Sequence, residues 1–160
     1  MSRKSVSRYA RAVAITSFLF SAFAHALTCV AGLSPSTPIT DFTIDSGVGT
    51  ALHSKTGLMW DACSYGQTGT TCTGTATTYN WQQAFVAVAA ANASNYKGYA
   101  DWRLPNVKEL LSIAEKCREN PAINADVFPA TVTSSGYWSS TSNGSNAAYA
   151  RYVRFSDGEN

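Results

Sequence analysis

Charged side chains are scarce in this chain of 160 residues, because lysine, arginine, aspartate and glutamate make up only 14% of it. Four of its 12 basic residues lie in positions 1–26, which leaves 8 basic against 10 acidic residues in the remainder. A chain with so little positive charge lacks the general electrostatic field that attracts nucleic acid. We therefore expect no nucleic-acid partner.

Histidine and the common catalytic motifs are also lacking. His53 is the only histidine after position 26, and no nucleophile stands at a recognisable spacing from it. The sequence contains no G-x-S-x-G motif, no H-E-x-x-H motif and no phosphate-binding loop. From these absences we predict no enzyme, no catalytic residue and no cofactor.

A long apolar run is missing as well. The longest candidate, Ala12–Ala24, is interrupted by three hydroxyl residues and is shorter than the ~20 residues that a membrane-spanning helix needs. It follows four basic residues and ends in Ala24-His25-Ala26, the small-residue pattern of a cleavage site. We interpret residues 1–26 as a signal peptide and expect no membrane span after its removal. The protein is predicted to be secreted, periplasmic or on the cell surface.

All four cysteines lie after this segment, and an even number in an exported chain indicates two disulfides. Eight residues separate Cys63 from Cys72, which is longer than the C-x2–4-C spacing of zinc sites, so no metal site is predicted. We favour Cys63–Cys72, which closes a loop rich in glycine and threonine, together with Cys29–Cys117. Four cysteines allow three pairings, and the sequence alone leaves them open.

The most informative segment is Gly98–Cys117. Its first half is expected to be a loop that ends at Pro105, because the residue before a proline is driven to extended backbone. A helix should then begin after Asn106, since Glu109 stands three residues later in the spacing of a capping box. Apolar residues recur at helical spacing as far as Cys117, so the helix is expected to extend to that position with one buried stripe.

A first helix is expected after Asn80, which has Gln83 three residues later and an alanine-rich continuation. Short alternating segments on either side of the two helices are predicted to be strands, with a hairpin turn at Lys55–Gly57. The strand candidates are Phe42–Ile44, Thr50–His53, Leu58–Trp60, Tyr137–Ser140 and Tyr149–Phe155.

This pattern predicts an α+β domain in which two helices pack on a small antiparallel sheet with long loops, and the terminal strands meet in that sheet. Residues 27–41 form an N-terminal lead-in and residues 42–160 form the domain. Asp157-Gly158 is a hairpin-turn signal with no returning strand after it. We therefore expect the domain to continue beyond Asn160, with its last strand outside this sequence.

Several motifs follow one another in a fixed order along the chain. They are Thr56–Trp60, Trp81–Ala84, Gly98-Tyr99, Asp101–Asn106, Lys108–Leu110, Asn120–Ile123, Phe128-Pro129 and Tyr137–Ser140. Together they resemble one bacterial family, the Lcl C-terminal domain family, from about Phe42 to the end. The resemblance implies an exported domain with a C-type-lectin-like fold, as in surface or pilus-associated proteins, and in some members an association with sulfated glycosaminoglycans. It also extends to the sulfatase-modifying enzymes of the same broad fold, although fold kinship does not transfer activity.

Two groups of residues are candidates for a site. The local basic patch, Arg151 and Arg154 with Tyr149 and Tyr152 between them, is the predicted ligand-binding group. Because a spacing of three on a strand points side chains to opposite faces, the two arginines are not expected to serve one flat anion site unless an edge bulge intervenes. The second group is interpreted as structural, since an arginine in a loop before a helix usually fixes that loop. It consists of Asp101, Trp102, Arg103, Pro105, Asn106 and Glu109.

We therefore expect an exported, non-catalytic binding domain, adhesin- or pilus-associated, that contacts glycans or a partner protein. The alternatives are a purely structural module of the cell envelope and a degenerate relative of the sulfatase-modifying enzymes. Trp60, Trp81 and Trp138 are expected in the core because they stand on predicted helices or strands with apolar neighbours.

Overall fold

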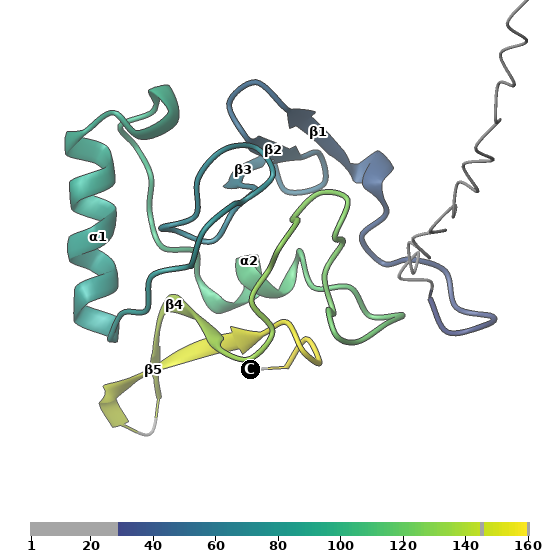
Figure 1. Cartoon of the computed structure of the whole chain (residues 1–160). Helices are drawn as coiled ribbons and strands as arrows, with labels where there is room; N and C mark the ends of the chain where they lie inside the picture. Colours follow the sequence, from purple (N-terminus) through teal and green to yellow (C-terminus); the bar gives the residue numbers. More distant parts are fainter. Residues whose placement is uncertain (1–28, 145, 160) are drawn as a thin grey trace, which may run out of the picture.

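The computed structural model of the chain describes residues 29–144 and 146–159, so the predicted signal peptide lies outside the described residues. Three short strands come first, two helices follow, and a longer pair of strands ends the chain (Figure 1). None of the helices in this part of the chain has the length and apolar composition that crossing a membrane requires. The predicted α+β class is confirmed.

The first sheet is antiparallel and contains β1 (Phe42–Asp45), β2 (Thr50–His53) and β3 (Leu58–Asp61), in that order. A short 3-10 turn, Ile39–Asp41, precedes it. The predicted hairpin connects β2 to β3 through Gly57, whose φ of +69° is a left-handed conformation that favours glycine. With β2 in the centre, one edge of β3 has no partner strand in the described chain.

The first helix, α1 (Trp81–Ala93), begins where it was predicted. Asn80 accepts a hydrogen bond from the N–H of Gln83, and the Gln83 side chain accepts one from the N–H of Asn80, so the capping box is complete. The helix has no charged residue, and only Ala84 and Ala91 are buried. A 3-10 turn, Tyr96–Gly98, follows it.

The second helix, α2 (Val107–Leu111), also begins at its predicted capping box, which joins Asn106 and Glu109. The prediction that it extends to Cys117 is wrong. The N–H of Ser112 is shared between the carbonyls of residues 108 and 109, and Ala114 leaves the helix to form a β-bridge with Ile123. Residues 113, 114 and 117 are still buried. The apolar spacing therefore predicted correctly which residues are buried, but it predicted too long a helix.

The second sheet contains β4 (Gly136–Asn143) and β5 (Asn146–Arg154), which are antiparallel. The prediction that the terminal strands meet in one sheet is wrong, because the described strands form two separate sheets. Just after β5, the carbonyls of Phe155 and Ser156 accept hydrogen bonds from the N–H groups of Ala122 and Asn120 at 2.7 and 2.8 Å. The backbone that continues β5 is therefore paired with residues 120 and 122, not with β1.

The core lies between the first sheet, α2 and the end of β5. Phe42 packs edge-on against Phe128 at 5.6 Å and stacks on the buried His53 ring at 4.7 Å. Helix α1 contributes no residue to this cluster and stands to one side of it (Figure 1). The cluster consists of Phe42, Ala51, Leu110, Ile113, Ala114, Ile123, Val127, Phe128, Val153 and Phe155.

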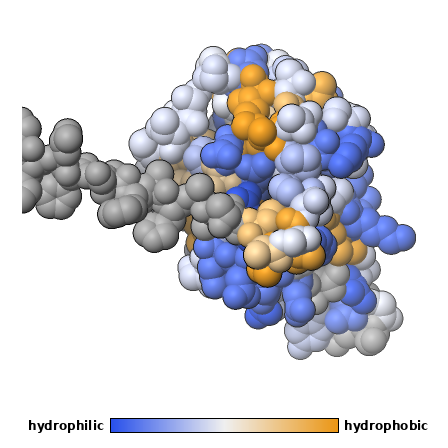
Figure 2. All heavy atoms as spheres, turned by 90° about the vertical axis from the view of Figure 1, so that its right-hand side faces the viewer, coloured by the Kyte–Doolittle hydropathy of each residue, from blue (hydrophilic) through white to orange (hydrophobic). Residues whose placement is uncertain are grey.

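The lead-in is fastened to the domain by a disulfide and a buried carboxylate. Cys29–Cys117 and Cys63–Cys72 are both bonded, as predicted. Glu115, only 1% exposed, accepts hydrogen bonds from the N–H and hydroxyl groups of Ser36 and Thr37 at 2.8–3.0 Å. The face of the molecule that lies on the right in Figure 1 is mostly polar, with separate apolar patches (Figure 2).

Candidate functional site

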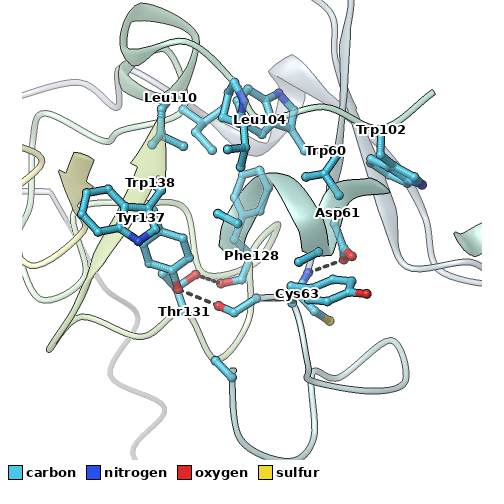
Figure 3. Close-up of a pocket in the computed structure, with 18 of the residues that line it drawn as sticks. Trp60, Asp61, Cys63, Trp102, Leu104, Leu110, Phe128, Thr131, Tyr137 and Trp138 are labelled. Atoms are coloured by element: carbon cyan, nitrogen blue, oxygen red, sulfur yellow. Dashed lines mark hydrogen bonds between the residues drawn. The ribbon is translucent and has the colours of Figure 1, made fainter. Parts of the chain in front are cut away.

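A cleft of about 1170 Å³ separates α1 from the two sheets. One wall is β3 and the loop after it, and another is the start of β4, where Tyr137 and Trp138 lie (Figure 3). The inner side of α1 forms a third wall. Most of the lining surface is apolar or aromatic, and α1 contributes Ala84, Ala87, Val88 and Ala91. A pocket with mostly apolar walls and a few polar groups is the usual form of a ligand site.

Five aromatic rings form a continuous row along one end of the cleft. The row begins at Tyr79, and the ring centroid of Tyr65 lies 6.2 Å from that of Tyr79 and 5.6 Å from that of Tyr96. Trp102 continues the row, at 6.2 Å from Tyr96 and 5.9 Å from Tyr99. All five rings line the cleft. Such rings present flat apolar faces to a ligand, and each tyrosine also has a hydroxyl group that can form a hydrogen bond.

Most charged groups around the cleft are already paired with one another. Asp61 accepts a hydrogen bond from Nζ of Lys97 at 2.7 Å, and both side chains are largely buried. Burial, followed by the negative charge of Asp61, raises the pKa of Tyr96. Arg154 donates to Asp157 at 2.8 Å. Asp101, in contrast, is exposed and has no hydrogen-bond or ion-pair partner among the described residues.

The loop that was interpreted as structural is held from both ends. Arg103 donates to both carboxylate oxygens of Glu109, at 2.7 and 2.8 Å, in the two-point geometry typical of a guanidinium. These hydrogen bonds raise the pKa of Arg103 and lower the pKa of Glu109. Glu109 also accepts from the N–H of Asn106. The loop that leads to Pro105 is therefore locked onto the first turn of α2.

Trp102 is fixed to the end of α1 by a double hydrogen bond. The Asn92 side chain accepts from the N–H of Trp102 at 2.7 Å and donates to its carbonyl at 2.9 Å. The indole of Trp102 donates to the carbonyl of Tyr96 at 2.9 Å. The sequence did not predict this contact of Asn92, although an asparagine side chain near a helix end is the kind of group that can bond to nearby backbone.

The other tryptophans are only partly buried. The prediction that they belong to the core is wrong for Trp81 and Trp138, which lie outside the core cluster, whereas Trp60 packs against that cluster. The indoles of Trp81 and Trp138 donate to the carbonyls of Ser139 and Tyr79 at 2.9 and 2.7 Å, which ties α1 to β4. Trp60 packs against the core cluster, and its buried Nε1 has no partner among the described residues. Trp60 and Trp138 line the cleft.

Tyr137 joins the two sides of the cleft at its floor. Its hydroxyl lies 2.6 Å from the hydroxyl of Ser64 and accepts a hydrogen bond from the N–H of Val132 at 2.9 Å. Burial raises the pKa of Tyr137. The loop after β3 and the start of β4 are therefore bound to each other at this point.

The predicted ligand-binding group is divided by the structure. Tyr152 and Arg154 line the cleft, and the Tyr152 ring lies 5.9 Å from Trp138. Tyr149 is 64% exposed and, like Arg151, lies outside the cleft lining. This division agrees with the alternation of side chains along a strand. The four residues do not form one binding surface.

The cleft itself was missed by the sequence reasoning. One signal was present, because α1 has apolar residues on all sides and no charge, and such helices are normally covered. Among the described residues, Cys29, Glu115 and Cys117 form the one group with metal-ligand chemistry. Both sulfur atoms are in a disulfide and the carboxylate is occupied by hydrogen bonds, so this group is structural.

The arrangement of the Arg103 loop, the capped α2 and the tryptophan-bearing strands can now be compared with known proteins. A family model described as the Lcl C-terminal domain matches residues 49–160. The chain belongs to the Lcl C-terminal domain family. All residues that line the cleft fall within the matched range, so the cleft is built from the Lcl C-terminal domain itself and not from the lead-in. No curated protein and no solved structure matches the chain.

Proposed function

We propose that this Lcl C-terminal domain is an exported, non-catalytic binding module, adhesin- or pilus-associated, that holds a glycan or a segment of a partner protein in the cleft beside α1. The observation that carries the proposal is the aromatic lining of a cleft of about 1170 Å³. A cleft of this size takes a ligand that offers flat apolar faces together with hydrogen-bonding groups. Sugar rings and extended peptides both have these properties.

Binding without catalysis is supported by the state of the charged groups. Asp61, Arg103 and Arg154 each have a short contact to an oppositely charged side chain of the same domain. Groups paired in this way stabilise the walls of the cleft and are not free to move a proton at a reacting atom. Export is supported by the two disulfides, which persist in oxidising compartments.

The proposal is tested with the mature domain on an array of sulfated and unsulfated glycans at low and high salt. Ala87 lines the cleft and Ala90 is exposed on the same helix, so Ala87→Trp places a bulky side chain in the cleft and Ala90→Trp is its matched control. We expect Ala87→Trp to abolish glycan binding and Ala90→Trp to retain it. Because most of the charged groups around the cleft are already paired with one another, binding should depend weakly on salt.

Two results would contradict this function. Glycan binding that survives Ala87→Trp would place the site outside the cleft, and binding that disappears at high salt would indicate simple ionic capture. Circular dichroism and the melting temperature of both variants establish that each one is folded. A domain that binds neither glycans nor a peptide in any form would remove the binding function altogether.

A further inference from the structure

The outer edge of β3 presents unpaired backbone groups to the cleft. Antiparallel pairing alternates between residues that bond to the partner strand and residues whose N–H and C=O groups point away from it. Ala62 donates to Gly49 at 3.1 Å, and with the observed register this assigns residues 58 and 60 to bonds with β2. The backbone groups of Met59 and Asp61 therefore point away from β2, and no described residue bonds to them.

The start of β4 has the same property. Arg154 directs both of its backbone groups away from β4, since its N–H donates to Glu159 and its carbonyl accepts from Gly158, each at 2.9 Å. Tyr137 and Val153 are consequently the hydrogen-bonded pair, and the alternation leaves Gly136 and Trp138 pointing away from β5. No described residue bonds to the backbone of these two residues either.

Both edges line the same cleft, because Met59, Asp61, Gly136 and Trp138 all belong to its walls. An unpaired sheet edge is a template for another strand. We propose that the cleft receives an extended polypeptide segment, which adds as a strand to β3 on one side and to β4 on the other and so joins the two sheets. This inference rests on the proposed binding function and chooses between its two ligand classes, since a glycan cannot continue a backbone ladder.

The residues that line the cleft also indicate which side chains the bound segment should have. Side chains of a strand alternate between two faces, and α1 offers Ala87 and Val88 to one of them, so small or branched apolar residues fit there. The lining contains the carboxylates of Asp61, Asp101 and Glu109 against the guanidinium groups of Arg103 and Arg154. Asp101 is the group left over, so the segment should have a basic residue at the end that reaches Asp101.

The test uses the mature domain and a synthetic peptide of about nine residues, alternating valine and threonine with an arginine at each end, a length typical of a strand. Its control is the same peptide with alternate backbone amides methylated, which keeps every side chain and removes the donors along one edge. We expect the unmodified peptide to bind at least about tenfold more tightly than the methylated one, a difference of about 1.4 kcal/mol. Hydrogen exchange should slow at the amides of Met59, Asp61, Gly136 and Trp138.

Equal binding of both peptides, or binding without slower exchange at these amides, would overturn the strand inference. Absence of peptide binding together with glycan binding that Ala87→Trp abolishes would also overturn it, and the proposed binding function would stand. A peptide with glutamate in place of both arginines should bind more weakly than the arginine peptide in the wild type. This preference should shrink in Asp101→Asn, and an unchanged preference would contradict the assigned role of Asp101.

Discussion

Glu115 accepts two hydrogen bonds from a residue 79 positions earlier in the chain, since the backbone N–H and the hydroxyl of Ser36 both donate to its Oε1 at 2.8 Å. Burial alone would raise the pKa of Glu115, but the hydrogen bonds from Ser36, Thr37 and Cys117 outweigh it and lower the pKa to about 2. A single acidic side chain thus connects the lead-in to the exit of α2.

Glu115 should make the stability of the domain decrease at acidic pH. Because its folded pKa lies below the ordinary value of 4.5, its contribution of about 3 kcal/mol is complete above pH 4.5 and is lost as the pH falls to 2. Urea unfolding at a series of pH values should show this loss. Glu115→Gln should flatten the dependence and destabilise the domain at pH 7, whereas Glu119→Gln, at an exposed position, should change neither. A steep acid dependence in Glu115→Gln would contradict the prediction.

His53 should make stability fall on mild acidification. Burial lowers its pKa below 6.5, in spite of the opposing charge of Asp41. The unfolded state therefore binds a proton at pH values where the folded state does not, so stability is retained above pH 6.5 and decreases below it. His53 is the only histidine after position 26, so His53→Gln should remove the slope between pH 7 and 5.5. A slope that persists in this variant would show that another group titrates there.

The two disulfides should differ in their contribution to stability. Cys29–Cys117 spans 88 positions and Cys63–Cys72 spans 9, and loop closure in the unfolded chain costs more for the longer loop. We expect a loss of roughly 4–5 kcal/mol for the Cys29→Ser/Cys117→Ser pair and roughly 2–3 kcal/mol for Cys63→Ser/Cys72→Ser. Thermal and urea unfolding measure both. The reverse order would mean that the Gly/Thr-rich loop stabilises more than its length implies.

Trp60 and Trp138 provide a matched pair for hydrogen-bond energetics. The buried Nε1 of Trp60 has no hydrogen-bond partner within residues 29–144 and 146–159, whereas that of Trp138 donates to the carbonyl of Tyr79 at 2.7 Å. Trp138→Phe should cost roughly 1–3 kcal/mol more than Trp60→Phe, because it leaves a carbonyl without its donor, and Trp60→Phe removes an unsatisfied group. Urea unfolding gives the difference. Equal costs would indicate that the indole of Trp60 is satisfied in solution.

The Arg103–Glu109 pair should be visible in a titration. Removal of the guanidinium in Arg103→Gln should raise the pKa of Glu109 toward its ordinary value, because the hydrogen bond from Arg103 is the main cause of its depression. Since Arg103 is 56% exposed, the accompanying loss of stability should stay within about 1 kcal/mol. Carboxyl-carbon NMR follows Glu109 directly. Arg154→Gln, which removes a different exposed ion pair, should leave Glu109 unchanged.

The beginnings of the helices could be predicted from sequence because each is encoded locally. Asn80 with Gln83 and Asn106 with Glu109 form the expected capping boxes, and their spacing of three is sufficient to find them. The β2–β3 hairpin was equally accessible, because Gly57 supplies the left-handed residue that the turn requires. Both disulfide pairs agree with those favoured from the sequence.

The features that were missed depend on contacts between distant segments. The end of α2 is decided by the bridge between Ala114 and Ile123 and by the bonds of Glu115 to the lead-in, none of which an apolar spacing reveals. The separation of the sheets depends on the pairing of residues 120 and 122, not of β1, with the backbone after β5. The cleft lies between elements that are distant in the sequence. The sequence pattern of α1 indicates only that the helix has more apolar surface than the core covers.

Helix α1 is attached to the rest of the domain near both of its ends. Its first residue, Trp81, is fastened to β4 through Ser139, and Asn92 near its last turn is fastened to Trp102, while the alanine-rich middle faces the cleft. Neither attachment involves Ala87 or Val88, the side chains of that middle stretch that line the cleft. Substitutions at these two positions therefore change the width of the cleft and leave both attachments in place.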